Sequence, residues 1–86
     1  MLKFEHTVKD PLGIHARPAG QIAKLAKGFA DSTITVEKDG NAVRAVQLMK
    51  LMGLGVKNGD VITVTVEGGN EEAAFAAVKE FFAANL

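Results

Sequence analysis

The alternation of hydrophobic and polar residues along the chain predicts four short β-strands. Near the start, Leu2 and Phe4 alternate with polar neighbours, and after a slip in the pattern Val8 continues their side. Such alternation is typical of a strand with one buried face. Three later segments alternate in the same way or are rich in β-branched residues, namely residues 33–38, 42–45 and 61–67. Asp39-Gly40, between the first two of these, predicts a tight hairpin turn.

Apolar residues spaced three and four apart predict a helix from about Ala16 to Lys27. Pro18 marks its first turn, because the N–H groups there have no partner within the helix and a proline costs no hydrogen bond. Gly28 follows its last residue, where glycine commonly ends a helix. The segment from Gln47 to Gly53 is short and rich in leucine and methionine, and we interpret it as a second, short helix.

A third helix is expected after Asn70, a residue that favours the N-cap position. Two glutamates follow it, and acidic residues in the first turn interact favourably with the helix dipole. The residues predicted to face the core are Ala74, Val78 and Phe81, flanked by Phe75 and Phe82.

The order β-α-β-β-α-β-α predicts an α+β fold. We expect a four-stranded antiparallel sheet that is covered on one face by the three helices. The 86 residues contain no repeat and no linker, so a single domain spanning residues 1–86 is expected.

Composition narrows the function. Ten basic and ten acidic residues cancel, which gives no general electrostatic basis for binding nucleic acid or membranes. The chain has no cysteine, and its two histidines, His6 and His15, lie at unrelated places, so we expect no metal site and no cofactor. No apolar run approaches the roughly 20 residues that span a bilayer. The first residues lack the basic and apolar segments of a secretory signal, which predicts a cytoplasmic protein.

Candidate chemistry is concentrated between Leu12 and Gly20. His15 stands just before the first predicted helix, and Arg17 lies in its first turn. A helix N-terminus offers free N–H groups and partial positive charge, which suits a phosphate. A phosphoryl group on His15 would be held by the backbone N–H groups of Ala16 and Arg17 and by the Arg17 side chain. Arginine there opposes the helix dipole, so an anionic ligand explains it better than helix stability does. The alternative is that His15 is an ordinary cap or surface residue.

The segment Gly13-Ile14-His15-Ala16-Arg17-Pro18-Ala19 resembles the signature of the HPr family, the histidine-containing phosphocarrier proteins of the bacterial sugar phosphotransferase system. The resemblance covers essentially the whole chain. It includes Gln21, Lys24 and residues 26–29 in the first helix, and Leu48-Met49 and Leu54-Gly55-Val56 around the second. It implies an open-faced sandwich and a carrier that is not itself an enzyme. His15 would accept a phosphoryl group at Nδ1 from phospho-enzyme I, which takes it from phosphoenolpyruvate, and pass it to sugar-specific IIA components.

The resemblance also implies that partners dock on the first two helices around His15. Met49 and Met52 are expected to be exposed, since so short a helix cannot bury both of them together with Leu48 and Leu51, and flexible thioethers suit several partners. The alternative is that they fill the core. Lys24 and Lys27 would complement acidic partner surfaces, or they are simply solvated charges. The predicted docking residues are Gly20, Lys24, Lys27, Gln47, Leu48, Met49 and Met52.

Gln47 departs from many members of the family. Aligned through Gly40 and Val43, it takes the place of a serine that a regulatory kinase phosphorylates in those relatives. The resemblance therefore implies that this chain is not regulated at that position.

Two other functions remain open from the sequence. A carrier of a regulatory or nitrogen-type branch would have the same features. An α+β module that binds a free anion through His15 and Arg17 would share the local chemistry. We expect the chain to be a monomer.

Overall fold

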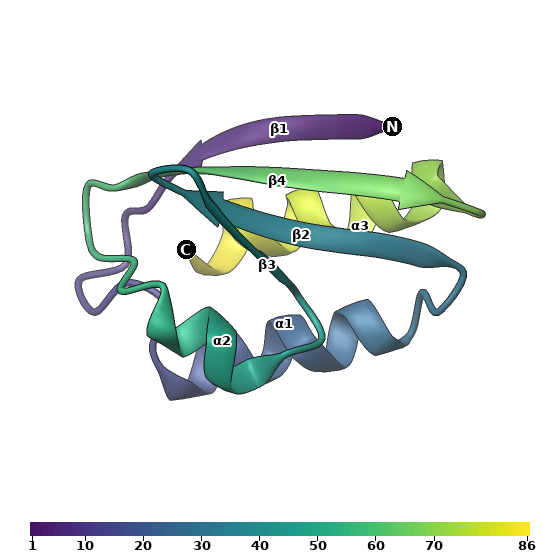
Figure 1. Ribbon diagram of the computed structural model, residues 1–86. Helices are drawn as coiled ribbons and strands as arrows, with labels where there is room; N and C mark the ends of the chain where they lie inside the picture. Colours follow the sequence, from purple (N-terminus) through teal and green to yellow (C-terminus); the bar gives the residue numbers. More distant parts are fainter.

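The computed structural model describes residues 1–86, and its elements follow the predicted order (Figure 1). They are β1 (Leu2–Thr7), α1 (Ala16–Lys27), β2 (Ser32–Lys38), β3 (Asn41–Arg44), α2 (Leu48–Gly53), β4 (Val61–Gly68) and α3 (Glu71–Asn85). No helix is both long enough and apolar enough to span a membrane.

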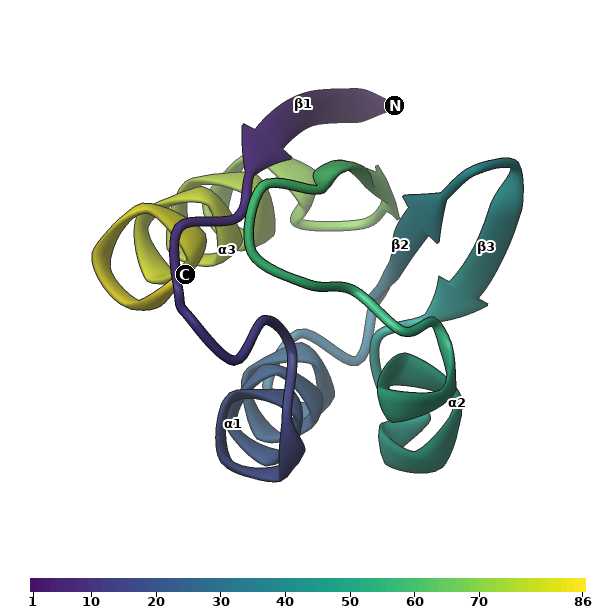
Figure 2. The same ribbon diagram turned by 90° about the vertical axis from the view of Figure 1, so that its left-hand side faces the viewer.

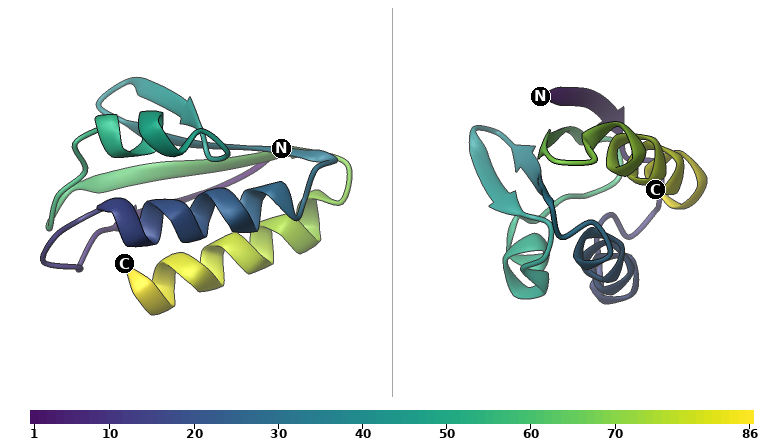
Figure 3. Two further views of the ribbon diagram at one scale, coloured as in Figure 1. Left: turned by 90° about the horizontal axis from the view of Figure 1, so that it is seen from below. Right: turned by 90° about the vertical axis from the view of Figure 1, so that its right-hand side faces the viewer.

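The strands form one antiparallel sheet in the order β1-β4-β2-β3. Val66 in β4 lies opposite Leu2 of β1 on one side and Ile34 of β2 on the other. The helices all lie on one side of the sheet (Figure 2), and α1 runs between α2 and α3 (Figure 3). The predicted fold class is confirmed.

The hairpin between β2 and β3 has the predicted two-residue turn. Asp39 and Gly40 adopt positive φ angles of 52° and 83°. Positive φ at both central residues is the turn geometry that matches the twist of paired strands.

A cluster of 17 buried hydrophobic residues fills the space between the sheet and the helices. β4 contributes Ile62, Val64 and Val66, each fully buried, because β4 is a central strand and its inward side chains are covered by helices. The outward residues of the same strand include two threonines that stay half-buried.

The predicted slip in β1 is wrong. The inward side is continuous through Leu2, Phe4, His6 and Val8, while the residues between them are exposed. His6 is therefore a strand residue that takes an inward position. Its ring stacks edge-to-face on Phe82 with centroids 5.7 Å apart, so an imidazole substitutes for an apolar side chain without any break in the strand period.

The predicted inward face of α3 is wrong at one residue. Phe82 is fully buried, whereas Phe81 is only half-buried on the flank. Ala74, Val78 and Phe82 are four residues apart and lie along one stripe. Phe82 also contacts Phe4 edge-on, with ring centroids 5.9 Å apart, which completes the core under β1.

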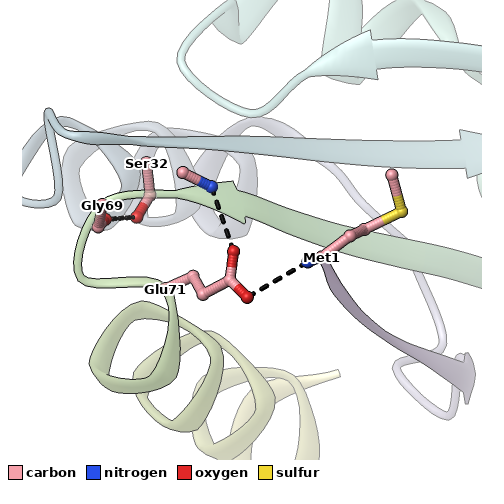
Figure 4. A network of polar contacts seen from close by, with 5 residues as sticks. Met1, Ser32, Gly69 and Glu71 are labelled. Atoms are coloured by element: carbon pink, nitrogen blue, oxygen red, sulfur yellow. Dashed lines mark hydrogen bonds and ion pairs between the residues drawn. The ribbon is translucent and has the colours of Figure 1, made fainter.

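Asn70 precedes α3 as predicted, but its side chain makes no capping hydrogen bond because its backbone is left-handed, with φ 58°. The Glu71 carboxylate instead accepts hydrogen bonds from the Gly68 N–H and from the Met1 amino group, each at 3.1 Å (Figure 4). These contacts hold the pKa of Glu71 below its usual value, the amino-group hydrogen bond being the main cause. Beside them, the Ser32 hydroxyl donates to the Gly69 carbonyl, which joins β2 to the same turn.

Candidate functional site

The loop before α1 is folded into a tight turn by Asp10. Its Oδ1 accepts a hydrogen bond from the Leu12 N–H at 2.8 Å, and its carbonyl accepts one from the Gly13 N–H at 3.0 Å. Aspartate commonly bonds the backbone two residues further on in this way. The turn sets the direction in which the chain enters α1.

Gly13 lets this loop lie directly against the chain that follows α2. Its φ is +67°, and a Cβ at this position would collide with the Val56 carbonyl and lie 2.7 Å from the Lys57 Cα. The same Val56 carbonyl accepts the Ile14 N–H at 3.1 Å. The residue before His15 is thereby fixed to a second segment of the fold.

The end of α3 holds the loop from the other side. The Leu86 carbonyl accepts hydrogen bonds from the N–H groups of Lys9 and Asp10, the latter at 3.1 Å. Asn58 donates from its side-chain amide to the Lys9 carbonyl at 3.0 Å. His15 thus stands at the end of a loop that is fastened at several points.

His15 occupies the N-cap position of α1 without capping it. Its backbone is extended, with φ −101° and ψ −174°, and its carbonyl accepts the Ala19 N–H at 3.0 Å. Its side chain makes no cap hydrogen bond and is 35% exposed. The N–H groups of Ala16 and Arg17 lie in the first turn, where no intrahelical acceptor exists. An ordinary capping role does not explain the histidine.

His15 and Arg17 line one surface hollow of about 230 Å³. The complete lining is Asp10, His15, Arg17, Pro18, Gln21 and Asn85. Within it, Asp10 Oδ1 lies 3.9 Å from His15 Nε2. The hollow therefore combines an imidazole, a guanidinium, a carboxylate and two side-chain amides beside a helix N-terminus.

Sequence reasoning missed three residues of this hollow. Asp10 is not among the predicted site residues, although an acidic residue a few positions before a candidate phosphoryl acceptor is a usable signal. Gln21 was noted only for its resemblance to the family, although it lies one helical turn after Arg17. Asn85 comes from the other end of the chain and depends on where α3 ends relative to α1 (Figure 3), which no local pattern encodes.

The predicted docking residues of α2 are exposed, with one helical residue buried beneath them. Met49 is 77% exposed, Leu48 39% and Met52 38%, whereas Leu51 is fully buried. The alternative in which all four fill the core is wrong, because a helix of six residues packed on its neighbours buries only its inner side. Gln47 lies half-buried at the N-cap of this helix without a side-chain capping bond.

On α1, Lys24 and Lys27 are exposed in the last turn, and Gly20 is partly exposed with open space where a Cβ would stand. Lys24 also lines a groove between α1 and α3 together with Phe29 and Phe81, so it lies on the side of α1 away from α2. In the loop before the site, Leu12 is 70% exposed, and sequence reasoning had not singled it out.

Charge is distributed unevenly in a chain whose formal net charge is zero. No aspartate or glutamate occurs from residue 11 to 30 or from residue 40 to 59, the stretches that contain α1 and α2. These two helices contribute Arg17, Lys24, Lys27 and Lys50. Their outer surface is consequently cationic as well as partly apolar.

Comparisons with known proteins identify the family of the chain. The family model described as "PTS HPr component phosphorylation site" matches residues 2–84. The chain is 40% identical over 79 residues to the phosphocarrier protein HPr of Mycoplasma genitalium, covering 92% of this chain and 90% of that protein. It superposes on the crystal structure of HPr-C-His from Thermoanaerobacter tengcongensis with a TM-score of 0.90 and 37% identity, over 98% and 93% of the two chains.

The crystal structure of an HPr dimer from the same organism, also 37% identical, gives a TM-score of 0.75 over 98% of this chain and 95% of that one. Because the family model and the relatives both cover nearly the full length, the fold and the function class are shared and are not limited to a short motif. The chain therefore belongs to the HPr family and is a phosphocarrier of the phosphotransferase system, not an enzyme.

Proposed function

We propose that His15 is the residue that accepts the phosphoryl group and that Arg17 stabilises it. The observation that carries the proposal is that His15 stands at a helix N-terminus without capping it and shares a hollow with Arg17. Two free backbone N–H groups, of Ala16 and Arg17, follow directly. Backbone donors and a guanidinium are the groups that bind phosphoryl oxygens most effectively.

The transfer itself is a displacement at phosphorus. The lone pair of Nδ1 of neutral His15 bonds to the phosphorus while the bond between the phosphorus and the donor atom of enzyme I breaks, and its electron pair returns to that atom. The remaining work is positioning and charge stabilisation. Arg17 and the first-turn N–H groups supply both without changing their own covalent state.

The donor in this proposal is enzyme I, phosphorylated from phosphoenolpyruvate, and the acceptors are IIA components. Both dock on the surface formed by α1 and α2. Its apolar part is Leu48, Met49 and Met52, Gly20, Lys27 and Gln47 also belong to it, and Lys24 lies at its far edge, on the side of α1 toward α3. A cationic and apolar surface suits an acidic partner with an apolar centre, and it accelerates encounter. We propose that the chain acts as one cytoplasmic domain and as a monomer.

The test is phosphorylation by purified enzyme I and phosphoenolpyruvate. The parent protein should gain about 80 Da, the mass of one phosphoryl group, in a form that is labile in acid and stable in base. His15→Ala should gain nothing and should melt at the parental temperature, because His15 is partly exposed.

His6→Gln is the matched control, since His6 is the other histidine of the chain and lies inside the strand β1. It should be labelled like the parent. Labelling of His15→Ala, or loss of labelling in His6→Gln with the fold intact, contradicts the proposal. Phosphate binding without labelling would identify an anion-binding module instead. Transfer onward to a sugar-type or a nitrogen-type IIA component then decides between the two branches.

A further inference from the structure

We infer that Asp10 is a positioning residue for phosphoryl transfer, whose carboxylate keeps the His15 proton on Nε2 and leaves the Nδ1 lone pair free. The inference rests on the proposed role of His15 as the acceptor. It adds a residue that neither the sequence motif nor the family resemblance brought into the site.

The carboxylate of Asp10 is held in place beside the ring. Its Oδ1 lies 3.9 Å from Nε2 of His15, and the two side chains line the same hollow. The Asp10 backbone is fixed at both ends, because its N–H donates to Leu86 and its carbonyl accepts from Gly13. Its side chain is only 24% exposed. A hydrogen bond of about 3 Å requires the two atoms to approach by roughly 0.9 Å, and we assign this approach to rotation of the side chains.

Both carboxylate oxygens keep lone pairs for this bond. Oδ1, the oxygen 3.9 Å from Nε2, accepts one hydrogen bond, from the Leu12 N–H, while Oδ2 accepts none within the chain. An ionised carboxylate offers about four lone-pair sites on its two oxygens, so it can accept hydrogen bonds from the Leu12 N–H and from the His15 Nε2–H at the same time. Asp10 is thus both a turn residue and a neighbour of the ring.

A hydrogen bond at one ring nitrogen determines what the other nitrogen can do. In neutral imidazole one nitrogen carries the proton and the other carries a lone pair. A carboxylate that accepts from Nε2–H stabilises the tautomer in which Nδ1 is the nucleophile, as outer carboxylates do for histidines that bind metals.

The same contact stabilises the product of the transfer. When Nδ1 bonds to phosphorus and the bond between phosphorus and the donor breaks with its electron pair left on the donor, the ring becomes positively charged, because Nε2 keeps its proton. The negative charge of Asp10 offsets that positive charge. On transfer to the next partner, the Nδ1–P bond breaks, the electron pair returns to Nδ1 and the neutral ring is restored with the proton still on Nε2.

Stabilising the ring and binding the phosphoryl group fall to different side chains of the hollow. Apart from Asp10 and His15, Arg17 is the only lining residue with an ionisable side chain, and its guanidinium suits the phosphoryl oxygens. Gln21 and Asn85 are neutral. The anion therefore serves the ring and the cation serves the phosphoryl group.

The decisive variant is Asp10→Asn, which removes the charge but keeps a side-chain oxygen for the Leu12 N–H. Asp60→Asn is the control, because the Asp60 carboxylate also accepts a nearby backbone N–H, that of Lys57 at 2.8 Å, and does not line the hollow. The first measurement is the ¹⁵N NMR spectrum of the His15 ring in the unphosphorylated protein at neutral pH. The second is the rate of phosphorylation by phospho-enzyme I.

We expect the parent and Asp60→Asn to show the Nε2–H tautomer, and Asp10→Asn to show a mixture of tautomers with phosphorylation slowed about tenfold, the lower end of the range for losing such a partner. Asp60→Asn should lose stability without changing the ring spectrum, which separates the tautomer from general loosening of the fold. An unchanged ring spectrum in Asp10→Asn, or a changed spectrum with an unchanged rate, overturns the inference. The ring spectrum needs no phosphoryl donor, so its failure is distinct from labelling of His15→Ala, which would refute the proposed acceptor.

Discussion

Gly13 is the residue on which the placement of His15 depends most directly, because it combines a positive φ with close contact to the Val56 carbonyl. Gly13→Ala should destabilise the protein by at least about 2 kcal/mol, through backbone strain and the collision of the new Cβ. It should also slow phosphorylation, since the loop must move away from Val56. Denaturant unfolding and the phosphorylation rate measure the two effects.

Gly20→Ala is the comparison, because a Cβ at Gly20 meets nothing within 4 Å and the residue lies inside α1. Alanine there should stabilise the protein by about 0.5–1 kcal/mol. Equal destabilisation by the two substitutions would contradict the special position of Gly13.

Arg17 should matter for transfer far more than for stability. It is exposed and forms no ion pair with any acidic side chain of the chain. Arg17→Ala should slow phosphorylation at least tenfold, equivalent to about 1.4 kcal/mol of transition-state stabilisation. Its free energy of unfolding should change by no more than about 0.5 kcal/mol. Arg44→Ala, an exposed arginine on β3, should leave the rate unaltered. A parental phosphorylation rate in Arg17→Ala would show that Arg17 does not stabilise the transferred phosphoryl group.

Among the elements, α2 has one buried residue that packs in the core and exposed residues that we propose for docking, all within six residues. Leu51 is fully buried, whereas Met49 and Met52 are exposed beside it. Leu51→Ala should therefore cost about 2–5 kcal/mol of stability. Met49→Glu and Met52→Glu should weaken binding to enzyme I while the melting temperature stays nearly constant. Calorimetric titration and thermal unfolding distinguish these outcomes, and a sharp fall in melting temperature for the methionine variants would place them in the core.

Asp60 links three parts of the fold. It pairs with Lys38 of β2 at 2.9 Å and accepts the Lys57 N–H. Lys38 also donates to the Gly55 carbonyl just after α2. The hydrogen bond from Lys38 is the main reason that the pKa of Asp60 lies below its ordinary value of 3.8. A carboxyl whose pKa is lowered by folding stabilises the folded state above its ordinary pKa. That stabilisation is lost as the pH falls through the lowered value.

Denaturant unfolding of the parent and of Asp60→Asn across pH 2–7 tests this. The parent should be the more stable at neutral pH, and the difference should vanish once the pH is below the lowered pKa of Asp60. A difference that stays constant down to pH 2 would show that the ion pair is not its cause.

The elements were predictable because each has a strong local signal, such as the helical spacing in α1 and Asp39-Gly40 in the hairpin. Local patterns failed where another element decides the outcome. Phe82 and not Phe81 is buried because it packs against Phe4 of β1. His6 can occupy an inward position of β1 because its ring packs edge-to-face against Phe82. His15 and Arg17 could be proposed as site residues from the sequence, whereas Asp10 and Asn85 come to line the same hollow only through tertiary contacts.

For the whole molecule, we predict a monomer, although the related HPr of Thermoanaerobacter tengcongensis has also been crystallised as a dimer, on which this chain superposes with a TM-score of 0.75. Light scattering after gel filtration at micromolar concentration should give a mass near 9.1 kDa. A mass twice as large, independent of dilution, would contradict this prediction.

The topology of the sheet also has a kinetic consequence. β1 pairs only with β4, and β2 pairs with β4 as well as with β3. Two of the three strand pairings therefore cannot form before residues 61–68 have been synthesised. During synthesis on a ribosome only the β2–β3 hairpin can form early. The loop before His15 also cannot reach its final structure before Val56 and Leu86 are present, because their carbonyls accept its backbone hydrogen bonds. Contacts so distant in sequence slow folding, because the entropy of closing long loops is lost before the contacts form. The nascent chain should therefore acquire a phosphorylatable histidine only when its last helix has left the exit tunnel.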